Sequence, residues 1–260
     1  MFTSFHIILL GLAALCAGTV DTIVGGGGLF TLPTLLAVGL SPALALGTNQ
    51  FTLSFGALIG TWRYARKGSL RWWPQTVLCA AGVIPGAWIG GHVAMAVPAS
   101  VLHLIVLILL VGVGVLLMVY RRDPEEFERP KPLNLARGIL LGLIGIALGF
   151  YEGFFGPGTG LFITMTGVVW LRLRYLEASG TAKAVSLVGN VTAFLTYATH
   201  HDVAWIIGLG MALFVSLGAY LGAWLAHRGG ARIIRRVMFG IIGLIAANVV
   251  RLLLPHQSIR

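Results

Sequence analysis

Apolar segments constrain the fold of this chain more than any other feature. With 57% hydrophobic and only 10% charged residues, the 260-residue sequence is too apolar for a soluble domain of this length. We therefore expect an all-α, polytopic membrane protein. The expected segments form two sets of five: 6–24, 28–40, 43–62, 75–97 and 99–120, then 137–155, 160–171, 178–199, 204–226 and 233–254. The first segment has no Lys or Arg ahead of it, so we read it as an uncleaved span and not as a signal peptide.

The second segment of each set is too short to cross a bilayer. About a dozen residues rise only about 18 Å as a helix, against a hydrocarbon core of roughly 30 Å. We therefore expect the first two segments of each set to form a broken helical hairpin that enters and returns to the same side. Each half would then consist of this hairpin and three transmembrane helices.

The basic residues predict the orientation of the two halves. Of the 18 Lys and Arg residues, 15 fall in four short stretches: 63–71, 121–137, 172–174 and 226–236. The positive-inside rule places these stretches in the cytoplasm, which gives the halves opposite orientations and puts both termini outside. No basic face remains for a nucleic acid. The sequence thus predicts two inverted repeats, 1–120 and 137–260, joined by a charged, proline-rich cytoplasmic linker at 121–136.

Two glycine-rich stretches interrupt the apolar segments at corresponding places. They are VDTIVGGGGLFTL at 20–32 and YEGFFGPGTGL at 151–161, and Pro157 and the glycines prevent a regular helix there. The stretches correspond through Asp21 and Glu152, Gly25 and Gly156, and Gly28 and Gly160. Irregular backbone is tolerated in a membrane only where protein or a watery cavity surrounds it, so the pair is our first candidate for a binding site.

The correspondence continues further along both halves. LGTNQ at 46–50 matches SGTAK at 179–183, and GAWIG at 86–90 matches GAYLG at 218–222. The last two are small-xxx-small patterns, which allow helices to approach closely in lipid. We assign their glycines to helix packing.

An anion is the expected guest, because a helix N-terminus presents free N–H groups and a positive dipole end. If the halves are inverted, the helices that begin at Gly28 and Gly160 can converge near the membrane midplane. The alternative is that the glycines only allow tight packing at a bend. The expected substrate-binding residues are Gly25, Gly26, Gly27, Gly28, Thr48, Asn49, Gln50, Gly156, Gly158, Thr159, Gly160, Lys183 and Asn190.

Three charged residues lie inside apolar surroundings and have open alternatives. Lys183 is either a counter-charge for the anion or the ion-pair partner of Glu152 or Asp21. Asp21 and Glu152 either take part in proton coupling or accept hydrogen bonds from loop amides and hold the breaks open. Asn190 either lines the pathway or bonds a neighbouring helix.

The sequence carries no signature of an enzyme, a cofactor or a metal site. It has no nucleophile motif and no phosphate-binding loop, and a metal site at His200, His201 and Asp202 would need further ligands. Cys16 and Cys79 lie within apolar spans and read as small buried residues. A membrane-embedded enzyme acting on lipid would need a catalytic cluster facing the headgroups, which we do not find.

The motifs together resemble the two repeats of the sulfite exporter TauE/SafE family of bacterial membrane permeases. The resemblance is carried by GTVDTIVGGGGLFTLP, LSPALALGTNQ and ARKGSLRW in the first half and by GFYEGFFGPGTG and SGTAKAVSLVGN in the second. It implies export or uptake of a small sulfur-containing or organic anion, such as sulfite or a sulfonate, across the inner membrane. The family usually has Asp in place of Glu152 and Asn in place of Ala182, which bears on the substrate more than on the fold.

We therefore expect a secondary transporter that moves a small anion by alternating access in the bacterial cell inner membrane. A passive anion channel is the alternative. The expected partners are the anion and the lipid bilayer, and the sequence leaves a homo-oligomer, the direction of transport and the coupling ion open.

Overall fold

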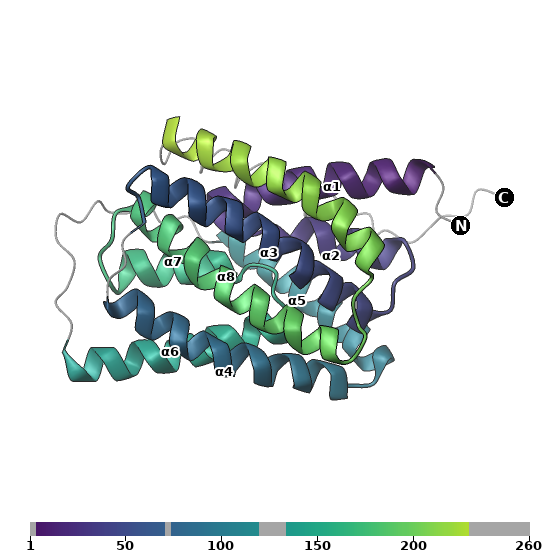
Figure 1. The fold of residues 1–260 in the computed structure, drawn as a ribbon. Helices are drawn as coiled ribbons and strands as arrows, with labels where there is room; N and C mark the ends of the chain where they lie inside the picture. The colour runs from purple at the N-terminus through teal and green to yellow at the C-terminus, as the bar shows by residue number, and fades with distance from the viewer. Residues whose placement is uncertain (1–3, 71–73, 120–133, 229–260) are drawn as a thin grey trace.

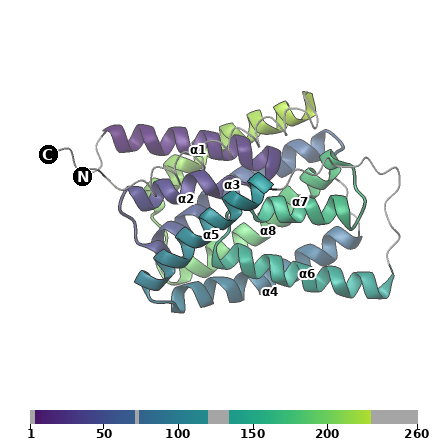
Figure 2. The ribbon, with the colours of Figure 1, turned by 180° about the vertical axis from the view of Figure 1, so that it is seen from behind.

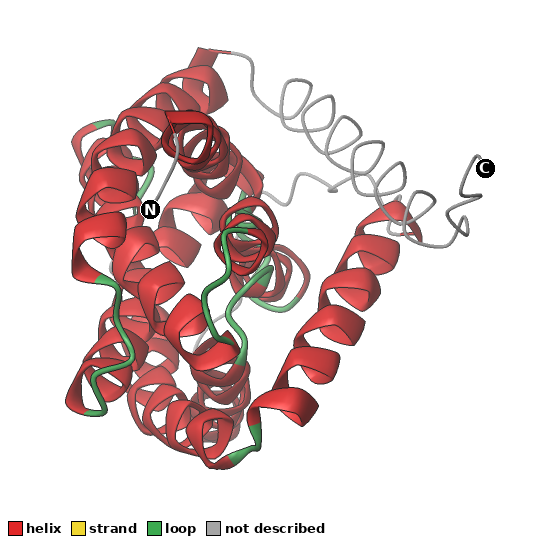
Figure 3. Ribbon diagram, turned by 90° about the vertical axis from the view of Figure 1, so that its right-hand side faces the viewer, coloured by secondary structure: helices red, strands yellow, loops and turns green. Residues whose placement is uncertain are grey.

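The computed structural model describes residues 4–70, 74–119 and 134–228, and every regular element in them is a helix (Figure 3). The helices are α1 (Ser4–Val24), α2 (Gly28–Ala37), α3 (Pro42–Arg66), α4 (Pro74–Ala96), α5 (Ala99–Val119), α6 (Leu135–Phe154), α7 (Thr159–Val169), α8 (Tyr175–Thr199) and the helix Trp205–Arg228. Each lies within a few residues of an expected segment, so the all-helical prediction is confirmed. The expected segment 233–254 and most of the linker 121–136 lie outside the described residues.

Four of the described helices are long and apolar enough to cross a membrane: His6–Val24 in α1, Thr76–Ala96 in α4, Leu135–Phe154 (α6) and Trp205–Arg228. Helices α3 and α8 are equally long, at 25 residues each, but carry the polar stretches LGTNQ and SGTAK. Composition alone therefore does not mark these two helices as spans. Their polar residues are buried inside the protein, which spares them contact with lipid.

The two interrupted segments run in opposite directions along the molecule. Helix α1 begins at the end marked N in Figure 1, whereas α6 begins at the other end, and Figure 2 shows the same arrangement from behind. After each break the short helix turns back, α2 toward the start of α1 and α7 toward the start of α6. Each pair is thus a broken hairpin, and the two breaks lie between the ends of the molecule.

Two glycine seams join helices of one half to helices of the other. A Cβ on Gly86 or Gly90 of α4 would overlap the backbone of α6, and a Cβ on Gly149 would overlap that of α4. In the same way, the backbone of α1 leaves no room for a Cβ at Gly218 or Gly222. The glycines of GAWIG and GAYLG therefore serve helix packing, as expected.

Apart from Lys183, the Lys and Arg residues of the described part gather at one end of the molecule. The end of α3, the start of α6, the α7–α8 connection and the end of Trp205–Arg228 all lie on the left in Figure 1. At the other end lie the start of α1 and the connections 38–41, 97–98 and 200–204, which contain no Lys or Arg. The residues at the basic end are Arg63, Arg66, Lys67, Arg137, Arg172, Arg174 and Arg228.

Candidate functional site

The two breaks meet in the interior of the protein. Gly25, Gly156 and Gly158 have left-handed backbone angles, with φ of +89°, +90° and +91°, which favour glycine. A Cβ on Gly25 would overlap the backbone of Gly160. Gly28, the first residue of α2, also lies close to the second break, because a Cβ on Gly28 would lie 2.9 Å from Pro157 Cγ. The N-termini of α2 and α7 therefore lie side by side.

Unpaired backbone donors line this meeting point. The N-cap residues of α2 and α7 are Gly27 and Gly158, which have no side chain that could cap the helix. Both helices therefore present N–H groups and the positive end of their dipole at the same place. Four amides in and beside the breaks have no acceptor within the described residues: those of Gly26, Gly28, Gly158 and Gly160.

Asp21 and Lys183 form a buried ion pair beside the first break. Lys183 Nζ lies 2.5 Å from Asp21 Oδ2, and the lysine side chain is 2% exposed. The other carboxylate oxygen, Oδ1, accepts a hydrogen bond of 3.2 Å from the Gly27 amide. Of the alternatives left open by the sequence, the structure thus shows an ion pair for Lys183, with Asp21 as its partner. It also shows Asp21 holding the first break.

Glu152 occupies the corresponding place beside the second break but has no such partner. Its side chain is buried, and its Oε2 atom has no hydrogen-bond partner within the described residues. The residue is held through its backbone, because Gln50 Nε2 donates to the Glu152 carbonyl at 2.5 Å. Gln50 corresponds to Lys183 in the repeat, so the two halves contact each other's breaks through equivalent residues.

The remaining polar residues of the expected site are buried, but they contact different groups. The Thr31 hydroxyl donates to Asn49 Oδ1, and Asn49 Nδ2 has no partner within the part of the chain that the structure describes. Thr159 Oγ1 donates to the Gly156 carbonyl at 2.7 Å and so stabilises the second break. Asn190 is 3% exposed.

Thr48 contacts a different part of the fold. Its hydroxyl donates to the Leu44 carbonyl at 2.6 Å and accepts from the Ala204 amide at 2.9 Å. Ala204 immediately precedes the helix Trp205–Arg228, so Thr48 caps that helix. Both of these hydrogen bonds are made to backbone outside the breaks.

Two tyrosines that support the breaks were not among the residues expected from the sequence. Tyr64 OH donates to the Thr22 carbonyl and Tyr197 OH to the Gly153 carbonyl, each at 3.0 Å. Both side chains are fully buried. Tyr64 follows Gln50 by the same number of residues as Tyr197 follows Lys183, which is the sequence signal that identifies them.

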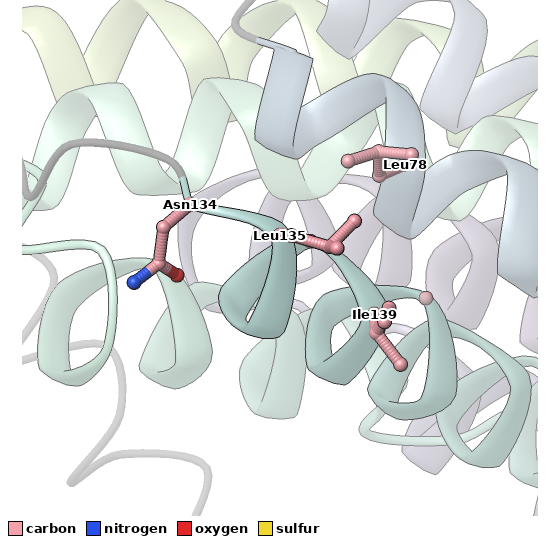
Figure 4. Close-up of a pocket in the computed structure, with 6 residues that line it drawn as sticks. Leu78, Asn134, Leu135 and Ile139 are labelled. Carbon is pink, nitrogen blue, oxygen red and sulfur yellow. The ribbon is translucent and has the colours of Figure 1, made fainter.

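An open groove lies elsewhere, between α4 and the start of α6. It has a volume of about 550 Å³ and is lined by Leu78, Asn134, Leu135, Gly138, Ile139 and Gly142 (Figure 4). Its lining is apolar apart from Asn134, whose side chain caps α6 by accepting from the Arg137 amide at 2.9 Å. The groove lies at the opposite end of α6 from Glu152 and offers little to an anion. The described residues contain no group of three or more His, Cys, Asp or Glu side chains that could hold a metal ion. Cys79 is buried as expected, but Cys16 lies on the surface of α1, so the expectation that it is buried was wrong.

Comparisons with known proteins agree with the membrane architecture. The chain is 34% identical to a probable membrane transporter protein of a Sinorhizobium species, ORF9, over 99% of this chain and 97% of that protein. It is 30% identical to the probable membrane transporter protein YfcA of Escherichia coli K12, over 93% and 90% of the two chains. No solved structure matches the chain. The model of the family "Sulfite exporter TauE/SafE" matches residues 10–249, so the chain belongs to the TauE/SafE family of membrane transporters.

Proposed function

We propose that this protein is a secondary transporter of a small anion, with the anion held where the N-termini of α2 and α7 meet. The observation that carries the proposal is the contact between the two breaks, with four unpaired amides around it. These donors and the two helix dipoles favour negative charge without any net charge from the Lys183–Asp21 pair. Asn49 Nδ2 offers a further buried donor.

Two further observations support an inverted repeat as the framework of this site. Helices α1 and α6 run in opposite directions, and the equivalent residues Gln50 and Lys183 each reach the break of the other half. The basic end of the molecule supports an orientation with that end in the cytoplasm of a bacterial cell, as a multi-pass protein of the inner membrane.

The family and the donor set together suggest the class of anion. The family's description names sulfite, and sulfite, sulfate and sulfonates carry several oxygens on one centre. Such a group can accept hydrogen bonds from both breaks at once, whereas a single-atom anion reaches fewer donors. We therefore propose a sulfur oxyanion or a sulfonate as the substrate.

Transport by such a site requires a conformational change, because the residues of the proposed site are buried. Gly25 to Gly28, Gly156 to Gly160 and Lys183 are all buried. In our proposal the site opens to each side of the membrane in turn, by alternating access. The glycine seams pair α4 with α6 and α1 with Trp205–Arg228, so we expect each seam-joined pair to move as one unit.

Flux measurements on purified protein in liposomes test this function. Uptake of labelled sulfite, sulfate, thiosulfate and sulfoacetate should saturate with concentration for the transported anion, and a passive channel would instead give a linear rise and single-channel currents. The same anion should raise the melting temperature of the protein in detergent, because it binds the native state. The proposal would be overturned if no sulfur anion of the panel stabilises the protein or enters the liposomes.

A further inference from the structure

The two buried carboxylates of the site differ in how their charge is balanced. Asp21 is neutralised by the ammonium group of Lys183, which lies 2.5 Å away. At the equivalent place beside the second break, Gln50 contributes an amide in place of the ammonium, and its Nε2 binds the Glu152 backbone instead of the carboxylate. The second break thus has a carboxylate like that of the first break, but within the described residues it lacks the cation that the first break receives from Lys183.

Among the residues that the structure describes, the surroundings of Glu152 supply no other positive charge that is free. The charged side chains that interact with it are Asp21 on α1 and Lys183 on α8, which neutralise each other. On its own helix, the Tyr151 hydroxyl donates to the Pro157 carbonyl at 2.8 Å. Helix α3 contributes Gln50, α7 contributes the Thr159 hydroxyl, and α4 contributes Val83, which lies with the Glu152 side chain against Gly189 of α8.

An uncompensated charge on a carboxylate buried inside the protein is strongly unfavourable, so a cation has to neutralise it. Two unpaired oxygens identify which cation fits. Glu152 Oε2 and Gln50 Oε1 are both buried without a partner within the described residues, and Gln50 reaches the backbone carbonyl of the same glutamate. A proton on the carboxyl group removes the uncompensated charge and makes Oε2 a hydrogen-bond donor, and Gln50 Oε1 is a buried acceptor that still lacks a partner within the described residues.

We propose that Glu152 holds an exchangeable proton and couples proton movement to anion transport, whereas Asp21 stays permanently paired with Lys183. This inference rests on the proposed transport function. A metal cation fits less well, because one carboxylate and the nearby amide oxygens fall short of the oxygen shell that hard cations take. The asymmetry between Lys183 and Gln50 therefore assigns different tasks to the two breaks.

The first test is spectroscopic and does not need a substrate. Infrared difference spectra of the whole protein in liposomes, recorded between acidic and alkaline buffer, should show the band of a protonated carboxyl group that disappears at high pH. Glu152→Gln should lack this band, while Glu177→Gln, at the start of α8, should keep it. A band that persists in Glu152→Gln would overturn the proposal.

The second test measures coupling with sulfoacetate, whose acid groups are both ionised near neutral pH, in liposomes that contain a pH-sensitive dye. The wild-type protein should move protons together with sulfoacetate. Glu152→Gln should exchange labelled for unlabelled sulfoacetate but move protons only at the rate of empty liposomes, and Glu152→Asp should restore proton movement. If sulfoacetate moves but Glu152→Gln leaves proton movement unchanged, this inference fails and the transport proposal stands. The same conclusion holds if sulfoacetate transport by the wild type depends on sodium instead of protons. If no anion of the panel moves, the transport proposal itself fails.

Discussion

Removal of one partner of the Lys183–Asp21 pair should destabilise the protein strongly. In Lys183→Met the Asp21 carboxylate loses the cation that is paired with it among the described residues, while its side chain is only 11% exposed. The Gly27 amide still donates to Oδ1, but one hydrogen bond does not replace a cation. Asp21→Asn leaves the ammonium of Lys183 in the same position, buried without a counter-charge.

The size of the effect follows from the burial of the pair. Breaking a buried ion pair by removing one partner costs about 3–5 kcal/mol. For a domain of this size, 1 kcal/mol corresponds to about 2–4 °C in melting temperature, so each single variant should melt about 6–20 °C lower. The double variant Lys183→Met with Asp21→Asn contains no unpaired charge. It should therefore melt above both single variants, with a coupling energy of about 2–3 kcal/mol.

Thermal unfolding in one detergent, followed by tryptophan fluorescence, measures all three variants against the wild type. Lys67→Met is the matched control, because it makes the same replacement at an exposed residue at the end of α3. Its free energy of unfolding should differ from that of the wild type by at most about 0.5 kcal/mol, so its melting temperature should stay close to the wild-type value. The reasoning is refuted if Lys183→Met melts at the same temperature as the Lys67→Met control. It is also refuted if the stability lost in the double variant equals the sum of the losses in the two single variants.

Three further predictions follow from the packing and the direction of the helices. Gly25→Ala should abolish flux and should lower the free energy of unfolding by about 1–3 kcal/mol more than Gly39→Ala does. Both glycines have left-handed backbone angles, but only Gly25 lies against other backbone. Equal losses of the two variants in thermal unfolding would contradict this. Gly86→Ala should lower the free energy of unfolding by about 1–3 kcal/mol, because its Cβ would overlap the Ile146 carbonyl. The control is a glycine-to-alanine change at a helical glycine that has open space around it. In a background without the native cysteines, Ser41→Cys should react with an impermeant thiol reagent from outside the cell and Arg174→Cys only from inside; labelling from the same side would rule out inverted hairpins.

Much of this fold can be predicted from the sequence because membranes restrict it so strongly. The lengths of the apolar segments gave helix ends within a few residues, and the short second segments appear as α2 and α7. The glycine runs mark both breaks, since a helix with Pro157 and several glycines cannot satisfy its backbone in lipid. The repeat register also connects Gln50 with Lys183 and could have pointed to Tyr64 and Tyr197 as well.

The partner of each polar group could not be predicted in this way. Lys183 is 162 residues away from Asp21 and far closer in sequence to Glu152, yet it pairs with Asp21. Thr48 lies within the same polar stretch as Gln50 but caps the helix Trp205–Arg228. Spacing along one helix defines a face, whereas the contacts of that face depend on helices that come from elsewhere in the chain.

The sequence by itself thus determined a helical membrane protein with two glycine-rich breaks in its apolar segments, because hydrophobic length and backbone chemistry are local properties. Only the tertiary structure decided that the two breaks touch, that Asp21 receives the ammonium and that Glu152 does not. The physical reason is that charge balance in a buried site depends on distances of a few ångströms between residues far apart in the chain.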